Sequence, residues 1–271
     1  MLSSFIFATI KLVAIMVLLI LIAYMRTPKF LLRIMFEKPV IEHVNYSESG
    51  NNQVIGSLYP TGFQMSNPHL CPDEGLNISL LIAVFSRPSL KMSRNAIRKT
   101  WGQFSKRRDV SIVFFVGQTD NEVTKIHLDF EQEYFADIVQ GRFSDTYFNL
   151  TLKTLSILEW VQTFCPKADF LLKTDEDVFV HVDNLLELLT TLDVEAKKIY
   201  GGIVKKLEPY RNEKIKYFIS TEQYKLDRFP DFMGGPGYLF AARLAADLYS
   251  TALQLSYIKV EDVLFTVTGL V

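Results

Sequence analysis

The chain reads Phe170-Leu171-Leu172-Lys173-Thr174-Asp175-Glu176-Asp177-Val178-Phe179-Val180 at the point where an apolar run meets three consecutive acids. The run predicts a strand over residues 168–172 that is buried on both faces, as the strands of parallel sheets are. Three acids flanked by apolar residues are costly to bury unless a positive group neutralises them. The segment therefore predicts a site of chemistry at the end of a central strand.

Strand-like and helix-like segments alternate on both sides of this strand. Apolar runs predict further strands over residues 78–86, 111–117 and 199–204. Helices are predicted over residues 89–101, 121–135, 149–164, 183–189 with Asp183 as the cap, and 243–255 after the glycine-rich run 234–242. This alternation predicts an α/β domain with a mostly parallel sheet covered on both faces. Ligands bind such sheets beyond the carboxyl ends of the strands.

Composition excludes several classes of protein. With 271 residues, 49% hydrophobic and 22% charged, the chain is neither disordered nor collagen-like. The net charge of −1 argues against a broadly basic nucleic-acid binder. Cys71 and Cys165 are too few for a disulfide framework and lack a zinc-site spacing, so they form one bridge or none.

The N-terminal segment has the composition of a membrane anchor. Between Leu2 and Met25 the only charge is Lys11, and a spanning helix needs about 20 apolar residues. We expect a cytoplasmic tail over residues 1–11 and an uncleaved signal anchor with its core at residues 12–25, extending from residue 2 if Lys11 snorkels. A cleavable signal peptide is the alternative, but the first ten residues have no basic side chain.

A spacer is predicted after the anchor. Residues 26–75 hold five of the ten prolines and show no sustained period, which is typical of a stem. The alternative is an extension packed on the domain. Two signals disagree about the orientation of the chain in the membrane. The basic residues that follow the anchor, Arg26, Lys29 and Arg33, favour a cytosolic C-terminus. The glycosylation sequons, which favour a lumenal domain, begin at Asn45, Asn77 and Asn149.

The acidic run predicts a metal site. On an extended backbone Asp175 and Asp177 can face one hard cation, Mn²⁺ or Mg²⁺. Phe179 excludes both an EF-hand loop and the aspartate motif of phosphoryl-transferring phosphatases. An exposed acidic turn is the alternative, which the apolar residues 178–180 disfavour. A metal site for a nucleotide diphosphate is the interpretation that remains.

Three further motifs accompany the acidic run. Arg94 and Arg98 share one helix face, either as an anion site or as a solvated face. The glycine-rich segment around Gly235 lets the backbone approach a sugar or phosphate closely. Of Glu261 and Asp262, one can enter the site as a general base, unless the pair only caps a helix.

In order along the chain, five motifs resemble the β-1,3-galactosyltransferase family, which includes β-1,3-N-acetylglucosaminyltransferases and is related to Fringe. The matching stretches are residues 94–102 (RNAIRKTWG), 145–154 (DTYFNLTLKT), 173–179 (KTDEDVF), 234–238 (GGPGY) and 261–263 (EDV). The resemblance runs from about residue 76 to the C-terminus. It implies a GT-A type fold over residues 76–271, a type II Golgi membrane anchor and a lumenal catalytic domain.

The resemblance also implies roles for particular residues. Asp177 would ligate Mn²⁺ directly, and Asp175 and Glu176 would contact the ribose of a UDP-sugar or support the ion. Asp262 would be the catalytic base. The remaining donor-side positions are Arg94 and Arg98 on a helix, Asp145 and Lys153 along the cleft, and Gly235 in the glycine-rich segment.

The activity implied is that of an inverting β-1,3-hexosyltransferase. Such an enzyme moves galactose or N-acetylhexosamine from a UDP-sugar to a sugar hydroxyl of a glycoprotein or glycolipid. Family members continue well past the Glu-Asp-Val motif, whereas this chain ends nine residues after Asp262, so we expect a domain truncated at its C-terminus. The alternatives are a Golgi-anchored inactive homologue that binds UDP-sugar or a partner, and a lumenal metal-dependent phosphohydrolase.

Overall fold

The structure is a computed structural model that describes residues 53–268. The predicted tail, the anchor core at residues 12–25, the first half of the stem and the Asn45 sequon lie outside these residues. Within the described part, no helix combines the length and apolar content needed to span a bilayer.

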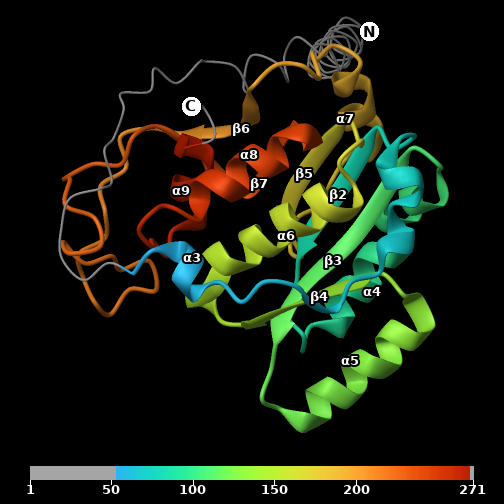
Figure 1. Cartoon of the computed structure of the whole chain (residues 1–271), viewed down its shortest axis with the longest axis horizontal. Coiled ribbons are helices and arrows are strands. Elements are labelled where there is room, and N and C mark those ends of the chain that lie inside the picture. The colour runs from blue at the N-terminus through green and yellow to red at the C-terminus, as the bar shows by residue number, and fades with distance from the viewer. Residues whose placement is uncertain (1–52, 269–271) are drawn as a thin grey trace, which may run out of the picture. The chain divides into compact units, whose positions relative to one another are not determined.

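Seven strands form one sheet in the order β1-β4-β3-β2-β5-β7-β6 (Figure 1). Their bounds are β1 Phe63–Met65, β2 Leu80–Phe85, β3 Val110–Gln118, β4 Ile138–Ser144, β5 Phe170–Asp175, β6 Ile199–Val204 and β7 Phe232–Ala241. β2 pairs in parallel with β3 and β5, and β3 with β4, whereas the β1–β4, β5–β7 and β6–β7 pairs are antiparallel. The α/β prediction is thus confirmed, but the sheet is mixed rather than mostly parallel.

The central strands are buried because their sequences are continuously apolar. All six residues of β2 are buried, and so are the first eight residues of β3. The register aligns Phe85 of β2 with Phe115 of β3 and with Asp175 of β5. The carboxyl ends of the parallel strands therefore meet at one edge of the sheet, and β5 brings its acids to that edge.

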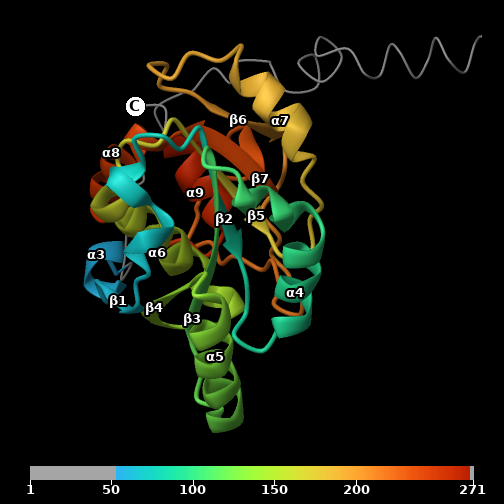
Figure 2. The same ribbon diagram turned by 90° about the vertical axis from the view of Figure 1, so that its right-hand side faces the viewer.

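Helices cover both faces of the sheet, with α6 and α8 on one side and α4 on the other (Figure 2). The α-helices are α3 Ile55–Leu58, α4 Lys91–Lys99, α5 Glu122–Phe135, α6 Leu150–Phe164, α7 Val182–Leu189, α8 Ala245–Ala252 and α9 Glu261–Thr268. Short 3-10 helices are η1 Pro68–Leu70, η2 Pro72–Gly75, η3 Trp101–Lys106, η4 Tyr147–Asn149 and η5 Ala242–Leu244. The mixed sheet between helical layers is consistent with the expected GT-A type fold.

Some features of the helices and strands differ from the sequence prediction. The cap of α7 is His181, whose Nδ1 accepts a hydrogen bond from the backbone N–H of Asn184 at 3.3 Å, and Asp183 lies in the first turn instead. Glu261 and Asp262 open a further helix, α9, which was not predicted from the sequence and packs against β7. β1, β4 and β7 were not predicted as strands from the sequence.

Residues 53–75, which the sequence assigned to the stem, pack on the domain. Ile55 and Tyr59 are buried in the core, and β1 pairs with β4 at the edge of the sheet. A disulfide joins Cys71 to Cys165 at the end of α6. The folded unit therefore begins before residue 76, because this segment buries apolar side chains and is covalently tied to the domain.

Candidate active site

A cavity of about 590 Å³ opens at the carboxyl ends of the parallel strands. Its walls come from the residues that follow β2 and β4, from the end of β5, from β7 and from the start of α9. The residues predicted from the sequence that meet in this cavity are Asp145, Lys153, Asp175, Glu176, Asp177, Gly235 and Asp262. Segments that lie far apart along the chain thus converge on one site.

The acidic turn after β5 leaves one carboxylate free. The N–H of Val178 donates to the carbonyl of Asp175 at 3.2 Å and closes the turn. Glu176 Oε2 accepts from Ser86 Oγ at 2.6 Å and from the N–H of Arg87 at 3.2 Å, which fixes it to the end of β2. Asp177 is exposed and has no hydrogen-bond or ion-pair partner among the described residues. The turn is more open than its apolar flank predicts, since Phe179 is 72% exposed.

The donor set of this turn suits one kind of metal site. Among residues 53–268, no three acids, histidines or cysteines are arranged to hold a metal ion. Mg²⁺ and ions like it are often held by only one or two carboxylates, with water and phosphate oxygens in the other positions. The free carboxylate of Asp177, with Asp175 two residues away at the end of β5, fits that arrangement and not an all-protein cage.

Lys153 and Asp145 form a buried ion pair in the cavity wall. Lys153 Nζ lies 2.9 Å from Asp145 Oδ2 and donates to the carbonyl of Ser86 at 2.8 Å. Asp145 Oδ2 also accepts from the N–H of Gly117 at 2.6 Å. Burial lowers the pKa of Lys153 below its ordinary value, and Asp145 opposes that shift. The pair fixes the loop after β4 to α6 and to the end of β2.

Asp262 has the properties of a general base. Its Oδ2 accepts from the N–H of Gly235 at 3.0 Å, and its Oδ1 accepts from the N–H of Val263 at 2.9 Å. Burial, with the adjacent charge of Glu261 as a smaller cause, raises the pKa of Asp262 to about 7. A carboxyl group with a pKa near the working pH is well matched to proton transfer. A Cβ on Gly235 would lie 3.2 Å from Asp262 Oδ2, so this contact favours glycine.

Glu261 points away from Asp262 into a buried hydrogen-bond network. Its carboxylate accepts from Lys173 Nζ, Thr154 Oγ1 and Tyr238 Oη, each at 3.0 Å. Its side chain is only 5% exposed, so it supports the floor of the cavity. Sequence reasoning missed Lys173, Thr154 and Tyr238. A lysine inside an otherwise apolar strand was the available signal, since lysine is almost never buried without a partner.

Arg94 does not line the cavity. It is fully buried, with its guanidinium held by Glu131 at 2.7 and 2.8 Å, by Ser86 Oγ at 2.8 Å, and by the carbonyls of Arg87 and Pro88. The expected donor-binding role is therefore corrected, because an acid on α5 neutralises this charge. Arg94 does support the site through Ser86, which also holds Glu176.

Arg98 is also paired outside the cavity. It lies 2.7 Å from Glu131 Oε1 and 2.7 Å from Asp137 Oδ1, and its guanidinium stacks on the ring of Phe135. The prediction that it binds the donor is corrected for the same reason as for Arg94. Sequence spacing placed both arginines on one helix face correctly but could not identify the acids opposite them.

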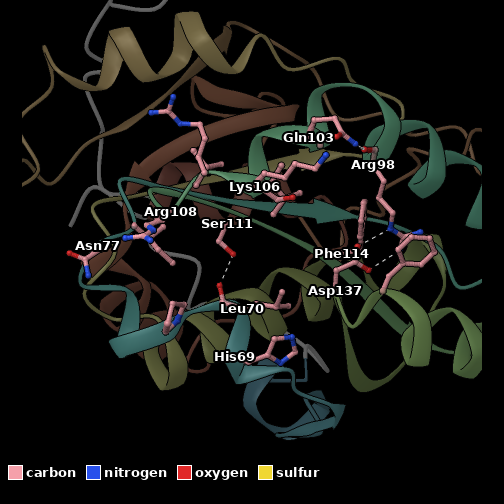
Figure 3. A pocket seen from close by; sticks show the side chains of 18 residues that line it. His69, Leu70, Asn77, Arg98, Gln103, Lys106, Arg108, Ser111, Phe114 and Asp137 are labelled. Carbon is pink, nitrogen blue, oxygen red and sulfur yellow. Dashed lines mark hydrogen bonds and ion pairs between the residues drawn. The ribbon is translucent and has the colours of Figure 1, made fainter.

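Arg98 instead lines a second, larger cavity of about 920 Å³ at the amino ends of the strands (Figure 3). In that cavity Ser111 Oγ donates to the carbonyl of Leu70, and the only acid among its described lining residues, Asp137, is paired with Arg98. None of the acids predicted to act in catalysis or metal binding lines this larger cavity. The smaller cavity is therefore the candidate active site.

Aromatic and cationic side chains form the outer wall of the active-site cavity. Tyr147 and Tyr217 have ring centroids 6.1 Å apart, and Lys216 Nζ lies 5.3 and 4.7 Å from them. Both rings are partly exposed. This wall lies in the same cavity as Asp262 and was not predicted from the sequence.

The family model described as "Galactosyltransferase" matches residues 92–270. This range contains the acidic turn, the glycine-rich β7 and Asp262. The chain belongs to the galactosyltransferase family. The resemblance predicted from the five motifs is confirmed.

Individual relatives of this galactosyltransferase-family chain are similar over about two thirds of its length. It is 38% identical over 187 residues to beta-1,3-galactosyltransferase 5 of Homo sapiens, covering 68% of this chain and 60% of the relative. Identity is 36% to N-acetyllactosaminide beta-1,3-N-acetylglucosaminyltransferase 4 of Homo sapiens, covering 68% and 50%. It is 35% over 204 residues to lactosylceramide 1,3-N-acetyl-beta-D-glucosaminyltransferase B of Xenopus laevis, covering 72% and 54%. The chain thus spans between half and three fifths of these relatives.

Proposed function

We propose that this chain is an inverting β-1,3-hexosyltransferase that moves galactose or N-acetylhexosamine from a UDP-sugar to a sugar hydroxyl of a glycoprotein or glycolipid. The observation that carries the proposal is one cavity that holds both the free carboxylate of Asp177 and the half-buried carboxyl group of Asp262, whose pKa is raised to about 7. The relatives named as a beta-1,3-galactosyltransferase and a beta-1,3-N-acetylglucosaminyltransferase support this substrate class.

The acidic turn forms the donor side. Asp177 and Asp175 would hold Mn²⁺ or Mg²⁺, which when bound neutralises the charge that develops on the diphosphate leaving group. Glu176, fixed by Ser86, is available to the ribose. Gly235 leaves room for the donor beside Asp262, and the Lys153–Asp145 pair keeps the opposite wall in place.

Asp262 takes the proton from the acceptor hydroxyl. The hydroxyl oxygen attacks the anomeric carbon from the face opposite UDP, so a new carbon–oxygen bond forms as the bond to the phosphate oxygen breaks. This single displacement inverts the anomeric configuration. The acceptor sugar lies along the rings of Tyr147 and Tyr217, since ligand sites are commonly lined by aromatic side chains with a few polar groups.

The same proposal includes a lumenal domain anchored in the Golgi membrane by residues 12–25. The disulfide between Cys71 and Cys165 supports it, because disulfides persist in oxidising compartments and are rare in the cytosol.

A donor screen tests the proposal. The purified chain is incubated with UDP-galactose, UDP-N-acetylglucosamine or UDP-N-acetylgalactosamine, with Mn²⁺ and a panel of glycan acceptors. We expect a glycoside product, and a loss of about 100-fold or more in kcat for Asp262→Asn with UDP affinity unchanged. Asp247→Asn, at an exposed surface pair, is the matched control. UDP binding without transfer would indicate an inactive homologue, and release of inorganic phosphate would indicate a phosphohydrolase.

A further inference from the structure

Lys173 is a buried lysine whose ammonium group uses all three of its N–H donors within the protein. Its side chain is 3% exposed, and Nζ donates to Asp175 Oδ1 at 2.9 Å, to the carbonyl of Gly235 at 2.8 Å and to Glu261 Oε1 at 3.0 Å. An ammonium has three donors, so none remains for a ligand. The ring of Phe85, with its centroid 4.1 Å from Nζ, covers the charge further.

The three acceptors belong to three different elements. Asp175 ends β5 on the donor side of the cavity, Gly235 lies in β7, and Glu261 opens α9. Gly235 accepts from Lys173 through its carbonyl and donates to Asp262 Oδ2 through its N–H at 3.0 Å. One ammonium therefore connects a donor-side carboxylate with the backbone that holds Asp262.

The second buried lysine of the cavity makes no such connection. Lys153 donates to Asp145, which follows β4, and to the carbonyl of Ser86, which follows β2. It has no described hydrogen bond to Gly235, Glu261 or Asp262. Lys153 is thus a comparison residue of the same type and burial with different partners.

We propose that Lys173 is a positioning residue that keeps Asp175 and Asp262 at a fixed position relative to each other, so that the anomeric carbon of the donor and the acceptor hydroxyl meet. This inference rests on the proposed function. Lys173 acts only through its three acceptors and does not touch substrate. A misplacement of reacting groups by about 1 Å costs about 100-fold in rate, so a shift of Asp262 relative to Asp175 should lower the transfer rate strongly.

A shift of Asp262 relative to Asp175 changes how the donor is divided between transfer to the acceptor and hydrolysis by water. In transfer, the acceptor oxygen attacks the anomeric carbon. In hydrolysis, water attacks the same carbon, the bond to UDP breaks, and the proton of the water passes to Asp262 or to solvent. Water needs no positioning by the acceptor wall, so a shift of Asp262 relative to the donor slows transfer more than hydrolysis. A purely structural defect lowers both in proportion.

The variants are chosen so that the chain still folds. Lys173→Met alone leaves Glu261 buried and unpaired, which is strongly destabilising. Lys173→Met/Glu261→Gln removes both charges, and the glutamine can still accept from Thr154 and Tyr238. Asp175 loses its partner in this variant but is 36% exposed, so its charge stays solvated. Glu261→Gln alone and Lys153→Met/Asp145→Asn are the comparison variants. The second removes both charges because Asp145, only 4% exposed, would otherwise be left buried and unpaired. Lys197→Met, at an exposed surface pair, is the neutral control.

Two measurements on the full chain test whether Lys173 positions Asp175 and Asp262. The first is the ratio of glycoside formed to free sugar released from the UDP-sugar. We expect Lys173→Met/Glu261→Gln to lower this ratio at least tenfold, with a Tm within about 4 °C of wild type. We expect Lys153→Met/Asp145→Asn to lower both products without changing the ratio. The second is calorimetry of UDP with Mn²⁺, in which the double variant binds at least tenfold more weakly than Glu261→Gln because Asp175 is no longer held.

An unchanged product ratio together with unchanged UDP affinity in the double variant would overturn the positioning role while leaving the proposed function standing. A wild-type chain that binds UDP with Mn²⁺ but forms no glycoside would overturn the proposed function, and the calorimetric comparison would still decide the role of Lys173 toward Asp175. Absence of UDP binding by the wild-type chain would overturn both.

Discussion

The buried ion-pair cluster of Glu131 with Arg94 and Arg98 gives a prediction that can be worked out in magnitude. Replacing Glu131 by alanine removes contacts of 2.7 and 2.8 Å to Arg94 and one of 2.7 Å to Arg98. Arg94 is completely buried and would keep its charge without an acid partner. Breaking a buried pair in this way costs about 3–5 kcal/mol.

The expected change in melting temperature follows from the size of the folded unit. For a domain of about this length, 1 kcal/mol shifts Tm by about 2–4 °C, so Glu131→Ala should lower Tm by about 6–20 °C. Glu122→Ala on the same helix is the matched control, because its pair with Lys125 is exposed and its loss should change Tm little. Both are measured by thermal unfolding followed by circular dichroism.

The pH dependence of the same variant provides a check on the cause. Burial alone would raise the pKa of Glu131, but the hydrogen bonds and charges of Arg94 and Arg98 hold it below its ordinary value. The stabilisation is therefore present above the pKa of the unfolded state and is lost as the pH falls through the folded pKa. The difference between wild type and Glu131→Ala should shrink in acid. A Tm loss below about 3 °C at neutral pH would refute the reasoning.

Three further predictions concern the active-site cavity. If Asp262 must be deprotonated to act as a base, kcat/KM rises with pH through about 7 and levels off above it, and a profile flat from pH 5 to 9 would contradict this. Asp177→Ala should abolish Mn²⁺-dependent UDP binding in calorimetry without lowering Tm, because the carboxylate has no partner among the described residues; retained binding would exclude it as a ligand. Gly235→Ala should lower kcat about tenfold or more with a small change in Tm, since its Cβ would lie 3.2 Å from Asp262 Oδ2, and wild-type turnover would show that the contact is not critical.

Much of the site could be predicted from the sequence, because it depends on strand ends. The continuous apolar runs identified β2, β3 and β5, and the rule that ligands bind beyond the carboxyl ends of strands located Asp175, Glu176 and Asp177. Burial of central strands is a property of local composition. Pairing direction is not, and β7 runs antiparallel to β5 although its sequence gives no sign of it.

The errors arose where a partner is distant along the chain. Arg94 looked like a ligand for an anion until α5 placed Glu131 against it, 37 residues away. Residues 53–75 read as a stem because their prolines and lack of period hide the few side chains, Ile55 and Tyr59 among them, that reach the core. Lys173 went unnoticed because its three acceptors come from three elements whose proximity only the fold creates.

The anomeric configuration of the first product tests the central claim most directly. The chain is incubated with α-linked UDP-galactose or UDP-N-acetylhexosamine, Mn²⁺ and an acceptor glycan, and the configuration and position of the new linkage are assigned by NMR. A single displacement assisted by Asp262 predicts a β-linked product joined to the 3-hydroxyl of the acceptor. An α-linked product would contradict the account, because it would require an even number of displacements at the anomeric carbon.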